Sequence, residues 1–143
     1  MADKDPYIYR IKQITKVVDG DTIDASIDLG FDIALEKRIR LAGVDTPESR
    51  TSDANEKKYG LESKEWLKHH IENAKNILIK TELPDSTEKY GRIIGHLFIN
   101  DQEASLNDQM IVEGYAWPYK GDTKVKDFEK LKTIRRQRGT LVE

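Results

Sequence analysis

Apolar and polar residues alternate along the first third of the chain, which is the pattern of half-buried β-strands. Residues 7–18 carry isoleucine and valine among lysine and threonine, and residues 22–29 alternate more regularly. Gly30 and the two residues after it mark a turn into a third run at residues 35–42. Three consecutive strands with short connections predict an antiparallel meander.

The apolar spacing changes to that of a helix at residues 57–74, where apolar residues recur three and four positions apart. Residues 76–81 and 92–99 return to the strand pattern. Two further helices are expected, one at residues 104–113 and one that Asp122 can cap. Five short strands with an inserted helix predict an α+β fold, a five-stranded OB-fold Greek-key barrel with three helices.

The composition fits one folded domain. The chain has 143 residues, of which 37% are hydrophobic and 35% are charged, within the range of globular proteins. We expect a single domain at residues 7–138, between a flexible N-terminus at residues 1–6 and a tail at residues 139–143. The formal net charge of −2 argues against a protein that coats nucleic acid through bulk charge, but a local basic cleft would suffice for an enzyme.

No stretch of the sequence approaches the roughly 18 apolar residues of a membrane span. The first residues are polar and carry no apolar signal segment, so the chain as given is expected in the cytoplasm. It would be secreted if a signal peptide had been removed, and a phage-encoded origin is a further alternative. The absence of cysteine excludes disulfides and thiolate chemistry.

Residues 38–48 carry the densest cluster of reactive side chains. A strand ends there in a turn, because Pro47 has no N–H and restricts Thr46 to extended geometry. Within nine residues lie one guanidinium, two carboxylates and a hydroxyl, from Arg40, Asp45, Glu48 and Thr46. Such charges are costly to bury unless something pairs with them, and a metal ion together with a phosphate would pair with all of them.

A second polar cluster occurs at residues 18–23, Val-Asp-Gly-Asp-Thr-Ile. Asp19 and Asp21 lie two residues apart, on one face if the backbone is extended, and Gly20 permits a bulge or tight bend. Taken alone, the segment Asp19-Gly20-Asp21 is better explained by a β-turn. Together with residues 38–48 it offers two hard oxygen ligands, which suit Ca²⁺ or Mg²⁺.

Val-Asp-Gly-Asp-Thr followed about twenty residues later by Arg-Leu-Ala-Gly-Val-Asp-Thr-Pro-Glu resembles the staphylococcal (micrococcal or thermonuclease) nuclease family. A third match is Lys-Tyr-Gly-Arg at residues 89–92, and the resemblance runs from about Tyr7 to about Arg138. It implies the same barrel fold and a Ca²⁺-dependent phosphodiesterase that hydrolyses DNA and RNA with little sequence preference. In this family a metal-associated water attacks phosphorus and leaves 3′-phosphate ends.

The resemblance implies which residues hold the metal. Asp21 and Asp45 would bind Ca²⁺ together with the backbone carbonyl of Thr46, and Asp19 would lie just outside these ligands.

The resemblance also implies catalytic roles. Glu48 would act as the general base or order the attacking water. Arg40 and Arg92 would hold the phosphate, because planar bidentate donors match the charge on its oxygens in the transition state. The alternatives are a surface glutamate at a helix start for Glu48 and surface salt bridges for the two arginines.

Four further residues would form a wall that binds nucleotides. Lys89 and Tyr90 match the family's contacts to a terminal phosphate, whereas Trp117 and Tyr119 offer aromatic faces on which bases stack without sequence readout. Trp117 replaces a family tyrosine, and it has an alternative role as a core residue packed on the last helix.

The expected partners are therefore DNA and RNA, with single strands preferred, and the expected protein is a monomer with no membrane or evident protein partner. The rival hypothesis is a catalytically weak or inactive nucleic-acid-binding module on the same fold. Such modules lack several catalytic residues, whereas this chain keeps Asp21, Arg40, Asp45, Glu48 and Arg92. Nothing in the sequence favours a structural or inhibitory protein.

Overall fold

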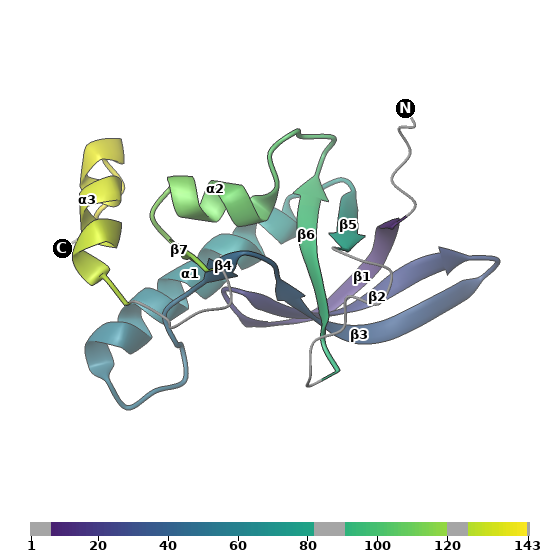
Figure 1. Cartoon of the computed structure of the whole chain (residues 1–143), viewed down its shortest axis with the longest axis horizontal. Coiled ribbons are helices and arrows are strands. Elements are labelled where there is room, and N and C mark those ends of the chain that lie inside the picture. The colour runs from purple at the N-terminus through teal and green to yellow at the C-terminus, as the bar shows by residue number, and fades with distance from the viewer. Residues whose placement is uncertain (1–6, 82–90, 120–125, 143) are drawn as a thin grey trace.

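The computed structural model describes residues 7–81, 91–119 and 126–142. In chain order the elements are β1 (Ile8–Asp19), β2 (Thr22–Gly30), β3 (Ile33–Leu41), β4 (Val44–Asp45), α1 (Ala54–Glu72), β5 (Ile77–Thr81), β6 (Ile93–Ile99), α2 (Leu106–Val112), β7 (Trp117–Pro118) and α3 (Phe128–Arg138). Figure 1 shows the helices gathered toward one end of the molecule, while the β2–β3 hairpin projects from the other end.

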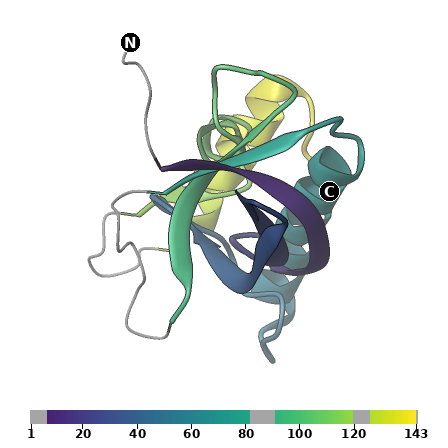
Figure 2. The ribbon, with the colours of Figure 1, turned by 90° about the vertical axis from the view of Figure 1, so that its right-hand side faces the viewer.

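The five longer strands close into a barrel in the order β1-β2-β3-β6-β5, with β5 pairing back onto β1. The neighbouring strands are antiparallel except β3 and β6, where residues 39–41 run parallel to residues 93–95. Figure 2 shows β1, in purple, curving around one side of this barrel. The predicted meander and the five-stranded barrel with three helices are confirmed, and the architecture is consistent with an OB-like α+β fold.

A second, small sheet was not predicted. It consists of β4 and β7, which pair antiparallel so that Asp45 lies opposite Trp117. Each strand has two residues, so neither shows an alternation that a sequence pattern could reveal. This sheet carries Asp45, and it therefore matters for the site described below.

The core lies inside the barrel and continues beneath the helices. Alternate strand residues point inward, as a two-residue period requires, and Ile23, Ile39, Ile79 and Leu97 are completely buried. Helices α1 and α2 contribute further buried side chains, among them Trp66, Leu67, Leu106 and Met110. Among the helices that the structure describes, none is long and apolar enough to cross a membrane.

Helix α1 begins slightly earlier than the sequence pattern indicates, at Ala54 rather than residue 57. Asp53 is its N-cap, and the Asp53 carboxylate accepts hydrogen bonds from the backbone N–H groups of Asn55 at 3.0 Å and Glu56 at 3.1 Å. Such a cap satisfies N–H groups that the first helical turn leaves without partners. The loop between β4 and α1 therefore ends at Asp53.

Helix α3 is capped by Asp127, whose carboxylate accepts a hydrogen bond from Lys130 N at 3.1 Å. The prediction that Asp122 caps this helix is wrong, since the helix starts at Phe128; Asp122 itself lies outside the described residues. The helix is fixed to α1 by an ion pair between Arg135 Nη1 and Glu62 Oε1 at 2.6 Å.

Candidate active site

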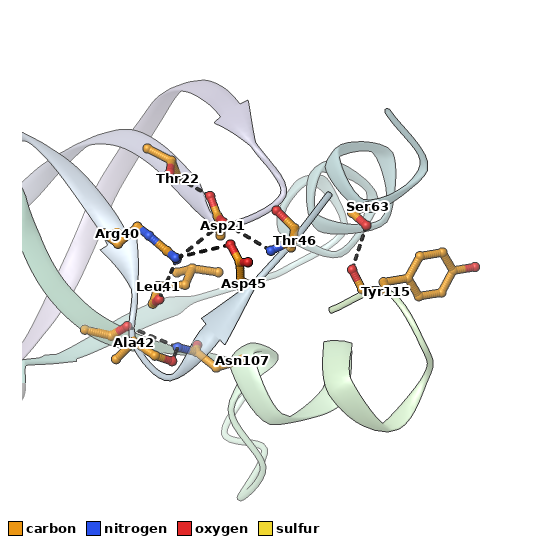
Figure 3. A network of polar contacts seen from close by, with 11 residues as sticks. Asp21, Thr22, Arg40, Leu41, Ala42, Asp45, Thr46, Ser63, Asn107 and Tyr115 are labelled. Atoms are coloured by element: carbon orange, nitrogen blue, oxygen red, sulfur yellow. Dashed lines mark hydrogen bonds and ion pairs between the residues drawn. The ribbon is translucent and has the colours of Figure 1, made fainter. Parts of the chain in front are cut away.

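The central feature of the site is one guanidinium between two carboxylates. Arg40 Nη1 lies 3.4 Å from Asp21 Oδ2, and Arg40 Nη2 lies 3.8 Å from Asp45 Oδ1. Figure 3 shows the three side chains converging, with Asp21 in the turn before β2, Arg40 on β3 and Asp45 on β4. The Asp45 side chain is only 4% exposed and the other two are 13% exposed, so these charges interact with little solvent screening.

Strand pairing explains why these three residues meet. Thr22 pairs with Arg40 across β2 and β3, and Leu41 N donates to the Asp21 carbonyl at 2.8 Å. The chain then turns at Gly43, which has a φ of 73°, a conformation that glycine adopts without strain. That turn brings Asp45 back beside the end of β3.

The Asp21 carboxylate is further oriented by two donors. The Thr22 hydroxyl donates to Oδ1 at 2.9 Å, and the backbone N–H of Thr46 donates to Oδ2 at 3.3 Å. Thr46 itself is buried. Donors to both oxygens fix the orientation of the Asp21 carboxylate.

Glu48 is fixed through its backbone. Glu48 N donates to Glu56 Oε2 at 3.0 Å, and the same oxygen accepts a hydrogen bond from Lys126 Nζ at 2.7 Å. The hydrogen bond to Glu56 raises the pKa of Lys126, and the charges of Glu56, Glu48 and Asp45 add to this effect, while burial opposes it. Lys126 therefore remains a cation close to both Glu48 and Asp45.

Helix α1 also supports the Glu48 peptide directly at Gly60. A Cβ atom at this position would lie 2.4 Å from both the carbonyl carbon and the carbonyl oxygen of Glu48, closer than such atoms can approach. On the following residue, the Ser49 hydroxyl donates a short hydrogen bond to Asp19 Oδ1. The segment that carries Glu48 is thus held by α1 on one side and by the end of β1 on the other.

Asp21, Arg40 and Glu48 line one open cleft of 520 Å³, which we call the charged cleft, whereas Asp45 and Thr46 are not part of its lining. Its polar lining includes the predicted residues Asp19, Asp21, Arg40, Glu48 and Arg92. It also includes two arginines that were not predicted, Arg38 and Arg50. Arg38 is engaged by Asp24 through hydrogen bonds of 2.8 and 3.0 Å, and this contact lowers the pKa of Asp24.

The aromatic residues separate into two environments. Tyr119 is half-buried, with its ring centroid 6.0 Å from Arg40 Cζ, so it borders the site. Trp117 is 4% exposed, packs edge-on against Phe128 with centroids 5.3 Å apart, and donates from Nε1 to the Asp127 carbonyl at 2.9 Å. The prediction that Trp117 stacks on bases is therefore wrong in this structure, because its faces are covered in the core beneath α3.

Two of the predicted nucleotide-binding residues, Lys89 and Tyr90, lie outside the described residues. Sequence reasoning missed Glu56 and Lys126, which are 70 positions apart. The one local signal was that Glu56 follows the helix cap Asp53 within the first turn of α1, where a carboxylate is favoured.

The site offers hard oxygen donors to a metal ion, but the described residues do not supply three metal-binding side chains close together. Among the described residues, no group of three or more histidine, cysteine, aspartate and glutamate side chains could hold a metal. Asp21 and Asp45 nevertheless face the same cation, the guanidinium of Arg40. Two carboxylates that leave other positions to a backbone carbonyl, waters and phosphate oxygens fit the ligand preferences of Ca²⁺.

Comparison with known proteins supports a common origin with a group of nucleases. The model of the family described as Staphylococcal nuclease homologue matches residues 38–138. The thermonuclease of Staphylococcus intermedius is 31% identical over 103 residues, which cover 72% of this chain and 56% of that protein. The thermonuclease of Staphylococcus hyicus is 30% identical over 106 residues, 73% of this chain and 56% of that protein.

A relative with a different name aligns over more of the chain. Protein ParB of Escherichia coli is 27% identical over 137 residues, which cover 91% of this chain and 69% of ParB. The chain thus spans little more than half the length of the thermonucleases that it matches.

Proposed function

Because this chain belongs to the family of staphylococcal nuclease homologues, we propose that it is a Ca²⁺-dependent phosphodiesterase that hydrolyses DNA and RNA with little sequence preference. The observation that carries the proposal is the charged cleft, which Asp21, Arg40, Glu48 and Arg92 line together. Arg40 also lies between the carboxylates of Asp21 and Asp45. A metal site, a general base and cationic donors can together activate water and stabilise the charge that develops on a phosphodiester during hydrolysis.

Asp21, Asp45 and the backbone carbonyl of Thr46 would hold the calcium ion. When bound, the ion would supply positive charge beside the scissile phosphate. The hydrogen bonds from Thr22 and Thr46 orient the Asp21 carboxylate, so that little reorganisation is needed on binding.

Glu48 would accept a proton from the attacking water or orient it, as the oxygen of water bonds to phosphorus and the bond to the 5′ oxygen breaks. A half-buried carboxylate held by its own backbone is suited to this task, because a general base must be placed within hydrogen-bonding distance of the proton it receives. Arg40 and Arg92 would donate to the phosphate oxygens, whose charge increases in the transition state. The products would carry 3′-phosphate ends.

The substrate would be bound as a single strand. Tyr119 offers one aromatic ring at the edge of the site, and a base can stack on it only if that base is not paired in a duplex.

The test is digestion of single-stranded DNA and RNA in Ca²⁺, in Mg²⁺ and in chelator, followed by analysis of the product ends. We expect 3′-phosphate products in Ca²⁺ and little turnover in Mg²⁺, which demands a tighter octahedral site. Undiminished turnover in chelator or equal turnover in Mg²⁺ would contradict the metal assignment. Binding of DNA without any products would favour the inactive binding module instead.

Calorimetry tests the calcium ligands independently of activity. Asp21→Asn and Asp45→Asn should each weaken Ca²⁺ binding, because each removes one ligand charge. Asp108→Asn is a matched control, since Asp108 is an exposed residue of α2 and its loss should leave the calcium affinity unchanged.

A further inference from the structure

A second hollow lies between β1 and α1, outside the charged cleft. It has a volume of 410 Å³, and three lysines from the two elements line it: Lys16, Lys64 and Lys68. We call it the lysine groove. Val17 and Ile71 contribute apolar surface to the lining, and Figure 2 shows α1 lying close to β1.

The positive charge of this groove is largely uncompensated. In the part of the chain that the structure describes, none of the three lysines forms an ion pair within 4.0 Å. Asp24 lies opposite Lys16 on β2, but both of its carboxylate oxygens accept hydrogen bonds from Arg38. Glu72 is the one acidic residue in the lining, so the groove carries a net positive charge.

The groove and the charged cleft adjoin along strand β1. Lys16 and Val17 line the groove, and the next two residues of β1, Val18 and Asp19, line the cleft. On α1, Lys64 follows Ser63, which packs so closely on Gly20 that a Cβ atom there would lie 2.8 Å from Ser63 Cβ. A polymer leaving the cleft beside β1 would therefore reach the groove directly.

We propose that the lysine groove binds the phosphate backbone of the single-stranded nucleic acid on the far side of the scissile bond, a substrate-binding site that rests on the proposed function. Lysine suits this task, because it contacts a phosphate as a point charge and reads no sequence. The groove lets a chain with a net charge of −2 bind a polyanion through a local positive surface.

The proposal makes a quantitative prediction about salt. Each phosphate neutralised on a single strand contributes about 0.7 to the slope of log affinity against log salt concentration. If all three lysines contact phosphates, replacing them with glutamine should make the slope shallower by about 2. Affinity for short substrates that occupy only the cleft should not change.

The test compares three full-length proteins: the wild type, the triple variant Lys16→Gln/Lys64→Gln/Lys68→Gln, and the control Lys37→Gln/Lys75→Gln/Lys130→Gln. The control removes the same charge from exposed positions elsewhere on the surface. Binding of a single-stranded oligonucleotide of about 20 nucleotides is measured in chelator at about 50 to 200 mM salt. Cleavage of a dinucleotide substrate and the melting temperature are measured alongside.

We expect only the groove variant to lose salt-dependent affinity for the oligonucleotide, with dinucleotide cleavage and melting temperature retained. Equal salt slopes for the groove variant and the control would show that the lysine groove does not bind the phosphate backbone, and would leave the nuclease proposal intact. The wild type could fail to cleave any substrate and still bind the oligonucleotide through the three lysines. That result would support the groove as a binding site and contradict the proposed nuclease activity. Preference of the groove for inorganic polyphosphate over DNA at equal phosphate concentration would also overturn the proposal.

Discussion

Glu56 Oε2 accepts a hydrogen bond from Glu48 N at 3.0 Å, and thereby links the backbone of the proposed general base to the first turn of α1. The same oxygen binds Lys126 at 2.7 Å, so one buried carboxylate joins the Glu48 loop, α1 and the residues just before α3. The position of Glu48 consequently depends on two residues that line no part of the charged cleft.

This contact predicts that Glu56→Ala lowers kcat by about tenfold to a hundredfold, because a small displacement of a catalytic group is costly. Glu56→Gln should retain more activity, since its amide oxygen can still accept from Glu48 N. Steady-state kinetics and calcium calorimetry measure both effects, and calcium affinity should stay within about threefold of wild type, or ~0.65 kcal/mol. A normal kcat for Glu56→Ala would show that Glu48 needs no such support.

Gly60→Ala should favour the α1 helix but lower kcat. In the interior of a helix this change usually stabilises by about 1 kcal/mol. Here the new Cβ would meet the Glu48 carbonyl at 2.4 Å, so the Glu48 peptide must move and kcat should fall by up to about 10²-fold. Leu61→Ala, at the exposed neighbouring position, is the control. Increased thermal stability together with full activity would contradict the close contact.

Arg92 should matter in the transition state rather than in substrate binding. Arg92→Ala is expected to lower kcat by about 10²–10³ and leave the affinity for single-stranded DNA nearly unchanged. Arg92→Lys should not restore activity, because an ammonium group keeps the charge but loses the planar pair of donors. A kcat for the lysine variant within about threefold of wild type, ~0.65 kcal/mol of barrier, would refute this role.

Trp117 and Tyr119 should respond in opposite ways to truncation. Trp117→Ala removes a buried side chain and should cost about 3–5 kcal/mol of unfolding free energy, with normal DNA affinity per folded molecule. Tyr119→Ala should weaken single-stranded DNA binding by about 1–3 kcal/mol and change stability little. Chemical denaturation measures the stability of both variants, and DNA titration measures their affinity. Weakened DNA binding by Trp117→Ala with normal stability would contradict the core role of Trp117.

Asp24 should stabilise the fold only above acidic pH. Its hydrogen bonds to Arg38 lower its pKa below the ordinary value of 3.8, an effect that burial partly opposes. A lowered folded-state pKa means that the stabilisation is present above the unfolded pKa and is lost as pH falls through the folded pKa. Asp24→Asn should therefore reduce stability at about pH 7 by less than about 1 kcal/mol.

The difference between Asp24→Asn and wild type should shrink as the pH falls through the lowered pKa of Asp24, because the wild-type carboxyl then becomes protonated. Urea unfolding across a series of pH values from neutral to acidic measures it. A difference that persists unchanged in acid would show that the ion pair with Arg38 is not its source.

The strands and the carboxylate cluster could be predicted because their signals are local. Ile23 and Ile39 are buried by a two-residue alternation that is visible in the sequence, and they pair directly across β2 and β3. Asp21 and Arg40 then meet because they lie at the adjoining ends of those same strands. The alternation of apolar and polar residues fixes the register of β2 and β3, and this register also determines which side chains meet at the ends of the two strands.

The rest of the site depends on contacts between distant segments. Whether Trp117 faces solvent or the core is decided by Phe128 and Leu131 of α3, not by its neighbours in sequence. Glu56 and Lys126 are ordinary charged residues in their own segments, and only folding brings them together. The cap of α3 was misjudged because Asp122 and Asp127 both precede apolar residues at helical spacing, and local propensity does not distinguish them.

The parallel pairing of β3 with β6 has a consequence for the order in which the protein folds. This ladder spans residues 39–41 and 93–95, and it joins the strand that carries Arg40 to the strand that directly follows Arg92. Pairing between segments so distant in the chain must overcome a large loop-closure entropy, which makes such contacts late events in folding. During refolding, the two arginines should therefore come together only in the last phase, and a nascent or partly folded chain would not yet have assembled the proposed site.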